Sequence, residues 1–76
     1  MHKIVVEVEN CDGNKVVYSY KDVEELKAEW YLEDEMPNIP MLDDVLIEAY
    51  IDGVVVRGKT FEDAMKYIGA KYNWIY

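Results

Sequence analysis

Histidine, cysteine and proline are scarce in this chain. Its 76 residues include one histidine, one cysteine and two prolines. His2 lies at an end that we expect to fray, so the sequence supplies no Ser-His or Cys-His pair and no histidine-metal site. Cys11 has no second cysteine for an internal disulfide, which fits a reducing compartment. We therefore expect neither nucleophilic nor zinc-dependent catalysis.

Other common functional signals are missing as well. We read no CxxC redox pair and no Gly-rich loop that would cradle a phosphate. No apolar run approaches the ~20 residues of a membrane span. Residues 1–4 lead directly into a strand pattern, so we expect no signal peptide. The prediction is a cytoplasmic protein that is not an enzyme and needs no cofactor or metal.

Basic residues are half as frequent as acidic ones. Eight Lys and Arg face sixteen Asp and Glu, for a net charge of −8 and a pI near 4.4. Phosphate backbones and anionic membranes repel such a chain, so neither is an expected direct partner. The excess is local, because residues 22–52 hold eleven acidic side chains and only Lys27. We expect a protein with a basic surface to be the natural partner of this stretch.

What the chain does contain is material for one small folded domain, spanning 1–76. Alternating apolar residues predict strands over 3–9, 15–20, 44–51 and 54–57. Asp52-Gly53 predicts a two-residue type I′ turn. Asp22 and Thr60 are expected N-caps of helices, the first running over 22–33. Both halves, 1–36 and 41–76, thus read as strand–strand–helix.

Two such halves predict an α+β fold. We expect a two-layer sandwich in which a four-stranded antiparallel sheet carries both helices on one face. In the second hairpin, strict alternation assigns these residues to the core: Val45, Ile47, Ala49, Ile51, Val54 and Val56. The opposite face then carries Leu46, Tyr50 and Val55, which are candidates for self-association into a homodimer. We expect the C-terminal segment 73–76 to dock on the core, because a small core needs its aromatic area.

The acidic stretch contains the candidate functional site. Glu25, Glu29 and Glu33 follow one another at helical i, i+4 and i+8 spacing, an arrangement that costs about 0.2–0.5 kcal/mol per like-charged pair. Further carboxylates flank the linker after this helix: Asp34, Glu35, Asp43 and Asp44. An unfavourable charge row in a small domain indicates a function. The hypothesis is an inhibitor that docks this acidic face on the basic, nucleic-acid-binding site of another protein.

In size and charge the chain is similar to small phage-encoded inhibitors, such as anti-defence and anti-CRISPR proteins. Three other interpretations remain open at this point. The first is that the acidic face serves only solubility. The second is an assembly module that self-associates through its open sheet face or a strand edge. The third is a calcium site built from the acidic residues at 33–35 and 43–44, although the spacing of an EF-hand loop is absent.

Overall fold

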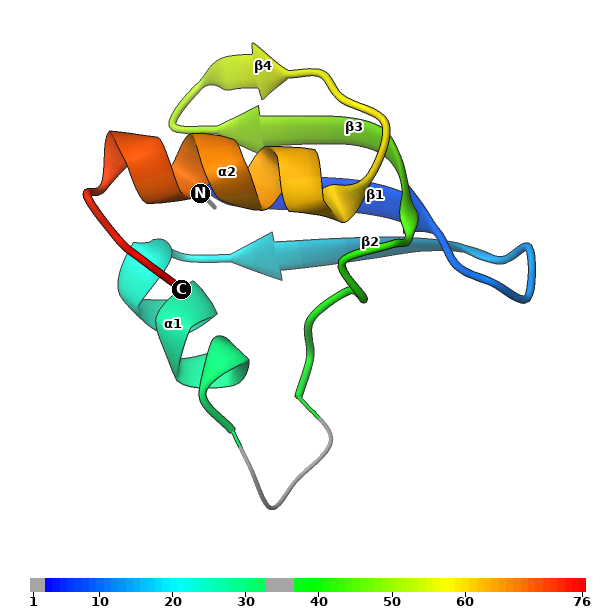
Figure 1. Cartoon of the computed structure of the whole chain (residues 1–76), viewed down its shortest axis with the longest axis horizontal. Coiled ribbons are helices and arrows are strands. Elements are labelled where there is room, and N and C mark those ends of the chain that lie inside the picture. The colour runs from blue at the N-terminus through cyan, green and yellow to red at the C-terminus, as the bar shows by residue number, and fades with distance from the viewer. Residues whose placement is uncertain (1–2, 33–36) are drawn as a thin grey trace.

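A computed structural model describes residues 3–32 and 37–76 of the chain. In chain order its elements are β1 (Ile4–Glu9), β2 (Lys15–Tyr20), α1 (Val23–Trp30), β3 (Val45–Ile51), β4 (Val54–Val56) and α2 (Phe61–Lys71). The strands form one antiparallel sheet in the order β2-β1-β3-β4 (Figure 1). The first strand of each half therefore lies in the middle of the sheet. This arrangement confirms the predicted α+β fold.

Both hairpin turns follow from their residues. In the 10–14 loop, Asn10 Oδ1 accepts hydrogen bonds from the backbone N of Asp12 and of Asn14, both at 3.0 Å. At the second turn Asp52 and Gly53 have φ angles of 52° and 82°. A type I′ turn requires positive φ at both central positions, so the predicted turn type is confirmed.

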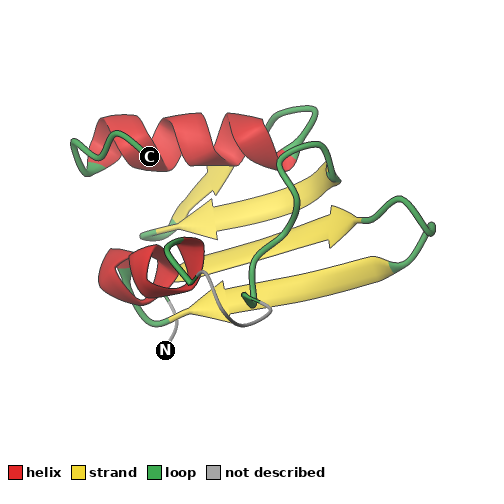
Figure 2. Ribbon diagram, turned by 60° about the horizontal axis from the view of Figure 1, so that its bottom comes forward, coloured by secondary structure: helices red, strands yellow, loops and turns green. Residues whose placement is uncertain are grey.

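One face of the sheet is buried. Side chains of β1 alternate strictly, with Ile4, Val6 and Val8 fully buried. Helix α2 lies across β1 and β3, and α1 follows the end of β2 (Figures 1 and 2). Both helices contribute to the same core cluster: Leu26 comes from α1, and Phe61, Ala64, Met65 and Ile68 come from α2. The core therefore lies between this sheet face and the helices.

A β-bulge in β3 makes part of the predicted core wrong. Glu7 pairs with Glu48, but Val8 pairs with Leu46, so Ile47 is an extra residue without a partner on β1. A bulge of this kind interrupts alternation. Leu46 is consequently buried, at 7% exposure, whereas Val45 and Ile47 are 51% and 42% exposed. The prediction had placed all three on the opposite sides.

Val54 is a second correction to the predicted core. It pairs with Ile51 and so shares the face of a buried residue, yet it is 44% exposed. The reason is its place at the turn end of β4, an edge strand that has a neighbour on one side only. Val56, further along β4, is buried as expected.

Both helices begin at the predicted caps. Asp22 accepts a hydrogen bond from Glu25 N at 2.9 Å. The carboxylate of Asp63 accepts from Thr60 N at 3.2 Å and from Lys59 N at 2.7 Å, which satisfies free donors at the start of α2.

Helix α1 ends at Trp30, short of the predicted residue 33. Leu32 N donates to Glu29 O, an i→i−3 bond that tightens and closes the last turn.

The C-terminal segment docks on the core, as predicted. Trp74 is 8% exposed, and its Nε1 donates to Tyr31 Oη at 3.0 Å. The Trp74 ring meets the Trp30 ring edge-on at a centroid distance of 6.0 Å. Trp74 N also donates to Gly69 O at 2.8 Å. These contacts join the end of the chain to the last turns of both helices.

Candidate partner-binding surfaces

The first half of the predicted acidic row is present on α1. Glu25 is exposed and Glu29 is partly exposed, one helical turn apart. Glu33 lies outside the described residues, and so do Asp34 and Glu35. Of the seven predicted contact residues, the structure therefore brings two together on α1 and leaves three without a described position.

Each carboxylate of this surface also has a local structural contact. Glu25 Oε2 accepts a hydrogen bond from Lys21 N at 3.1 Å, and Asp22 caps the helix. Glu29 Oε2 accepts from Asn38 N at 2.9 Å, while Asn38 O accepts from Tyr20 Oη at 2.6 Å. Glu29 and Tyr20 thus hold the backbone of Asn38 through its N–H and its carbonyl. Burial is the main cause that raises the pKa of Tyr20, so its hydroxyl stays protonated as a donor.

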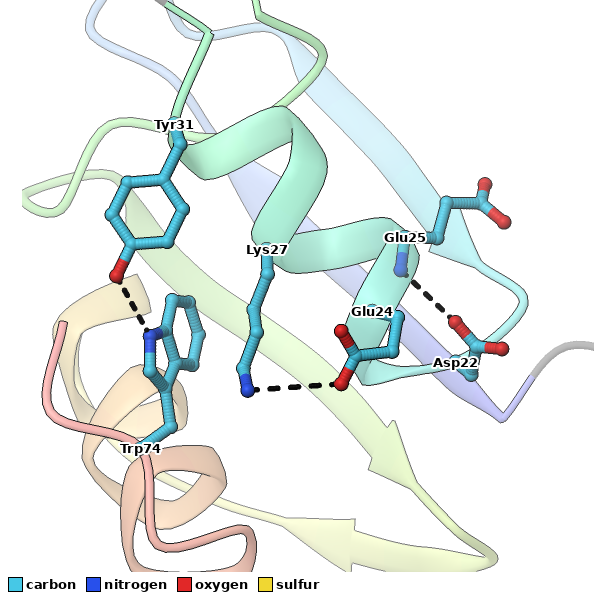
Figure 3. Close-up of polar contacts among 6 residues, drawn as sticks. All are labelled: Asp22, Glu24, Glu25, Lys27, Tyr31 and Trp74. Atoms are coloured by element: carbon cyan, nitrogen blue, oxygen red, sulfur yellow. Dashed lines mark hydrogen bonds and ion pairs between the residues drawn. The ribbon is translucent and has the colours of Figure 1, made fainter.

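Lys27, the one cation within α1, is held away from Glu25. Its Nζ lies 3.7 Å from Glu24 Oε1 and 5.6 Å from the centroid of the Trp74 ring. Figure 3 shows the side chain of Glu25 pointing to the other side of the helix. Glu24, with a side chain 77% exposed, was not among the predicted contact residues. Its place in the first turn, beside Glu25, was the signal for it.

The two acidic residues before β3 behave differently from each other. Asp43 is exposed. Asp44 is buried, at 7% exposure, and its Oδ2 accepts a hydrogen bond from Met41 N at 3.2 Å. Asp44 closes a turn, and its carboxylate, unlike that of Asp43, is engaged within the chain. The segment before β3 also lies apart from the start of α1 (Figure 1).

The calcium interpretation gains no support from the described residues. In residues 3–32 and 37–76 no three His, Cys, Asp or Glu side chains come together as metal ligands. Three of the five residues proposed for calcium, those at 33–35, fall outside this part of the chain. Asp44, a fourth, is already engaged by Met41 N.

The open face of the sheet is a second surface. Tyr50 and Val55 are paired across β3 and β4 and are 43% and 42% exposed, as predicted for this face. Leu46, the third predicted self-association residue, belongs to the core because of the bulge. Tyr50 Oη donates to Glu48 Oε1 at 2.6 Å, a bond that raises the pKa of Tyr50.

A sequence match to a phosphate-binding loop lies between β3 and α2, contrary to the expectation that the chain has no such loop. Residues 53–60 read Gly-Val-Val-Val-Arg-Gly-Lys-Thr, which matches the Gly-x-x-x-x-Gly-Lys-Thr spacing of a phosphate-binding loop. Such a loop must be irregular so that its N–H groups converge on the phosphate. Here Val54–Val56 form strand β4, paired with β3.

The start of α2 is also unavailable to a phosphate. Phe61 N and Glu62 N donate to the carbonyls of Asp44 and Leu42, at 2.9 and 3.1 Å. Lys59 N and Thr60 N donate to the Asp63 carboxylate. The donors that would bind phosphate therefore already have partners, and a carboxylate occupies the position. The match does not form a nucleotide site.

Comparisons with known proteins place this geometry in no family. No protein-family model matches the chain. No curated protein and no solved structure matches it either. In residues 3–32 and 37–76 there is no helix with the length and apolar character to span a membrane.

Proposed function

We propose that this chain is a small, non-enzymatic protein-binding domain that docks the acidic surface of α1 on a basic site of another protein. The observation that supports this proposal is the exposed pair of carboxylates in the first turn of α1, Glu24 and Glu25. They belong to the stretch 22–52, which carries the whole excess of negative charge. Lys27, its one cation, is held by Glu24 and the Trp74 ring.

The electrostatics of such a surface favour rapid and selective association. A cluster of one sign raises the rate at which an oppositely charged partner is encountered. Selectivity follows because a partner that carries negative charge at the same place is repelled. The site on the partner is one rich in Lys and Arg, and the chain blocks it by occupying it.

A nucleic-acid-binding site is the finer form of this proposal. Helix α1 has eight residues and is about 12 Å long, the span of roughly three to four phosphates of one DNA strand. Glu25 and Glu29 stand ~6 Å apart along the helix, almost twice the ~3.4 Å phosphate spacing. The carboxylates of the helix alone are therefore sparser than phosphates, so this form of the proposal needs further acidic residues of the stretch 22–52 to contribute.

Capture of partners from a bacterial lysate with the tagged full chain tests this proposal. The test variant is Glu24→Gln with Glu25→Gln, which keeps the hydrogen-bond acceptor for Lys21 N. Glu29 is left intact because it holds Asn38. The matched control is Asp12→Asn with Glu62→Gln, which removes the same charge from the 10–14 loop and from α2.

We expect wild type and control to retain a nucleic-acid-binding protein that the α1 variant loses. Retention should also fall severalfold with salt, since the Debye length shrinks from about 10 Å at 0.1 M to about 3 Å at 1 M. Equal retention by all three forms at every salt concentration contradicts the proposal. In that case the acidic surface serves solubility.

A further inference from the structure

Strand β2 forms one edge of the sheet and carries little that would protect it. It pairs with β1 over six residues in continuous register, and no other described strand lies beside it. Natural edge strands are usually short, bulged or interrupted by proline or charge. The opposite edge, β4, has only three residues, whereas the one charge of β2 is at its start, Lys15, and Val17 is 60% exposed. Of the two edges, β2 is therefore the one that can take a further strand.

The direction of the backbone groups on β2 follows from the pairing of its neighbours. In an antiparallel pair, opposite residues alternate between those that exchange both hydrogen bonds and those that exchange none. Asp52 N donates to Lys3 O, so the odd-numbered residues of β1 bond to β3 and the even-numbered ones to β2. Even-numbered residues of β2 lie opposite these and bond to β1. Lys15, Val17 and Ser19 therefore direct their N–H and C=O groups outward, and we call them the open row.

Local hydrogen bonds close both ends of the open row. Gly13 N donates to Asn10 O at 2.9 Å, and Lys21 N donates to Glu25 Oε2 at 3.1 Å. Lys21 is odd-numbered, so its N–H points outward as the alternation requires. The outward groups that a further strand can use are thus limited to residues 15–19, and a carboxylate of α1 lies at their end.

On the helix side, two carboxylates of α1 border this end of the open row. Glu25 is held by Lys21 N. Glu29 accepts from Asn38 N, and Asn38 O accepts in turn from the hydroxyl of Tyr20, the last residue of β2. Both carboxylates therefore lie near Tyr20. A strand added beside β2 places the side chain opposite Tyr20 on this same side, because directly opposite residues share a face.

The outer side of the open row carries charges of both signs. Lys15 lies opposite Glu9 of β1, and Lys21 follows the end of β2. This side therefore selects no particular charge. The helix side differs, because Lys27, the one cation of α1, is held at Glu24. A cation on the helix side of an added strand is accordingly favoured.

A second copy of the chain does not meet this requirement. When two β2 strands pair with Val17 opposite Val17, which uses the whole open row, Asn14 lies opposite Tyr20 and no cation reaches Glu25 and Glu29. In the view of Figure 1, α1 and the described segment before β3 also project beyond β2. Two copies would bring these projections together at one axis, whereas a single strand needs a width of only about 4.8 Å.

We propose that an extended segment of another protein adds to the sheet beside β2 as a fifth strand, with an arginine opposite Tyr20. The segment runs antiparallel to β2, like every other pair in the sheet. Main-chain hydrogen bonds to the open row hold it, a recurring mode of peptide recognition. The guanidinium lies against the carboxylates of Glu25 and Glu29. The preference for arginine rests on the proposed function, since it uses the acidic surface of α1, but the strand pairing does not.

Amide hydrogen exchange of the full chain, labelled with ¹⁵N and followed by NMR, tests this inference. In the free chain, the N–H groups of Val17 and Ser19 should exchange faster than those of Val16 and Tyr18, which bond to β1. The probe is the peptide acetyl-Arg-Thr-Val-Thr-Val-Thr-amide, which has arginine and valine on one side of a strand. At millimolar concentration we expect it to slow the exchange at Val17 and Ser19 severalfold.

Two matched peptides separate the main chain from the charge. Citrulline in place of the arginine should weaken binding severalfold, and equal binding overturns the arginine preference. Proline in place of the threonine opposite Val17 removes a main-chain donor and should abolish the slowing. Equal effects of this peptide and the probe, or no slowing at Val17 and Ser19, overturn the strand pairing. A dimeric free chain in which both N–H groups are already protected overturns it in favour of a second copy.

Ser19→Pro makes the same test on the protein and separates the two proposals. Proline is tolerated on an edge strand where the N–H it lacks would face solvent, and this variant keeps every carboxylate of α1. In the lysate capture, a partner lost by Ser19→Pro and by Glu24→Gln with Glu25→Gln supports both proposals. A partner that Ser19→Pro retains and the α1 variant loses supports the proposed function and overturns the strand pairing. Loss by Ser19→Pro alone has the reverse meaning.

Discussion

At the scale of single residues, Asp63 shows how one carboxylate can organise a junction. It accepts hydrogen bonds from the backbone of Lys59 and of Thr60, and these two contacts lower its pKa below the usual 3.8. The neighbouring Gly58 leaves room for this arrangement, because a Cβ there would lie 2.4 Å from the Cβ of Asp63. A side chain at position 58 would therefore displace the cap of α2.

Because the pKa of Asp63 is lowered in the folded state, its contribution to the stability of the fold depends on pH. A carboxylate with a lower pKa in the folded state stabilises the fold above its unfolded pKa, near 3.8. This stability is lost as the pH falls below that value and through the folded pKa. We expect Asp63→Asn to be less stable at neutral pH and to show a shallower loss of stability between pH 4 and 2. Urea unfolding across this pH range measures the difference.

The variant Asp12→Asn is the control for Asp63→Asn, because Asp12 lies in the exposed 10–14 loop. It should follow the wild-type pH dependence. If Asp63→Asn also follows the wild-type curve, its two backbone hydrogen bonds do not set the acid stability of the domain.

At the scale of elements, the end of the chain and α1 depend on each other. Helix α1 has eight residues, too few to be stable alone in water. It places Leu26 in the core, and Trp30 and Tyr31 contact Trp74. The tail therefore fixes the helix that carries Glu24 and Glu25. The position of the candidate site therefore depends on the contact between Tyr31 and Trp74, which are 43 residues apart in the sequence.

Replacement of the Trp74 side chain by a smaller one tests whether α1 depends on the C-terminal segment. We expect Trp74→Ala to lower the free energy of unfolding by about 3 kcal/mol, the cost of removing a large core aromatic. For a domain with a total near 5 kcal/mol, that leaves little margin. Urea unfolding followed by circular dichroism measures the loss. Trp74→Phe keeps most of the packing but loses the hydrogen bond to Tyr31, so it should fall in between.

Ile75→Ala serves as the control for Trp74→Ala, since Ile75 is 95% exposed in the same segment. It should retain wild-type stability. Equal losses for both variants would show that the C-terminal segment acts through its backbone and not through the Trp74 ring.

The elements could be predicted from the sequence because each carries its own local signal. Asp52-Gly53 specifies its turn by φ preference, and Asp22 and Thr60 specify helix starts by their side-chain chemistry. The bulge at Ile47 has no such signal. It depends on how β3 pairs with β1, a contact between distant segments, and so the faces of Val45, Leu46 and Ile47 were predicted wrongly.

The candidate site was less predictable than the fold for a similar reason. Helical spacing correctly placed Glu25 and Glu29 one turn apart. Spacing does not show which carboxylates are used internally, because that depends on tertiary contacts. Asp44 closes a turn at Met41, and Glu29 holds Asn38, nine residues away. The match to a phosphate-binding loop fails in the same way, since strand pairing decides what Val54–Val56 become.

At the scale of the whole molecule, the net charge of −8 acts against compactness. The ion pairs within the described residues have mostly exposed or partly exposed side chains. Pairs of this kind contribute little to stability. Repulsion among the remaining carboxylates is therefore the dominant long-range electrostatic effect in the folded state.

Moderate salt should accordingly stabilise the free protein. Screening weakens the repulsion, so we expect the thermal midpoint to rise by a few degrees as sodium chloride increases within the sub-molar range. The same salt should weaken partner binding, because that association uses the unscreened charge. A midpoint that falls with salt would show that attractive pairs outweigh the repulsion.

The bulge in β3 also bears on which changes of chain length this sheet tolerates. Elsewhere in a strand, deletion of one residue reverses the sides of all residues beyond it. Ile47 is the residue without a partner, so its removal leaves Leu46 inward, Glu48 outward and Ala49 inward. The strand would become regular and its buried set would stay the same. Ile47 therefore marks a place in β3 at which the chain can lose one residue and still keep the same buried side chains.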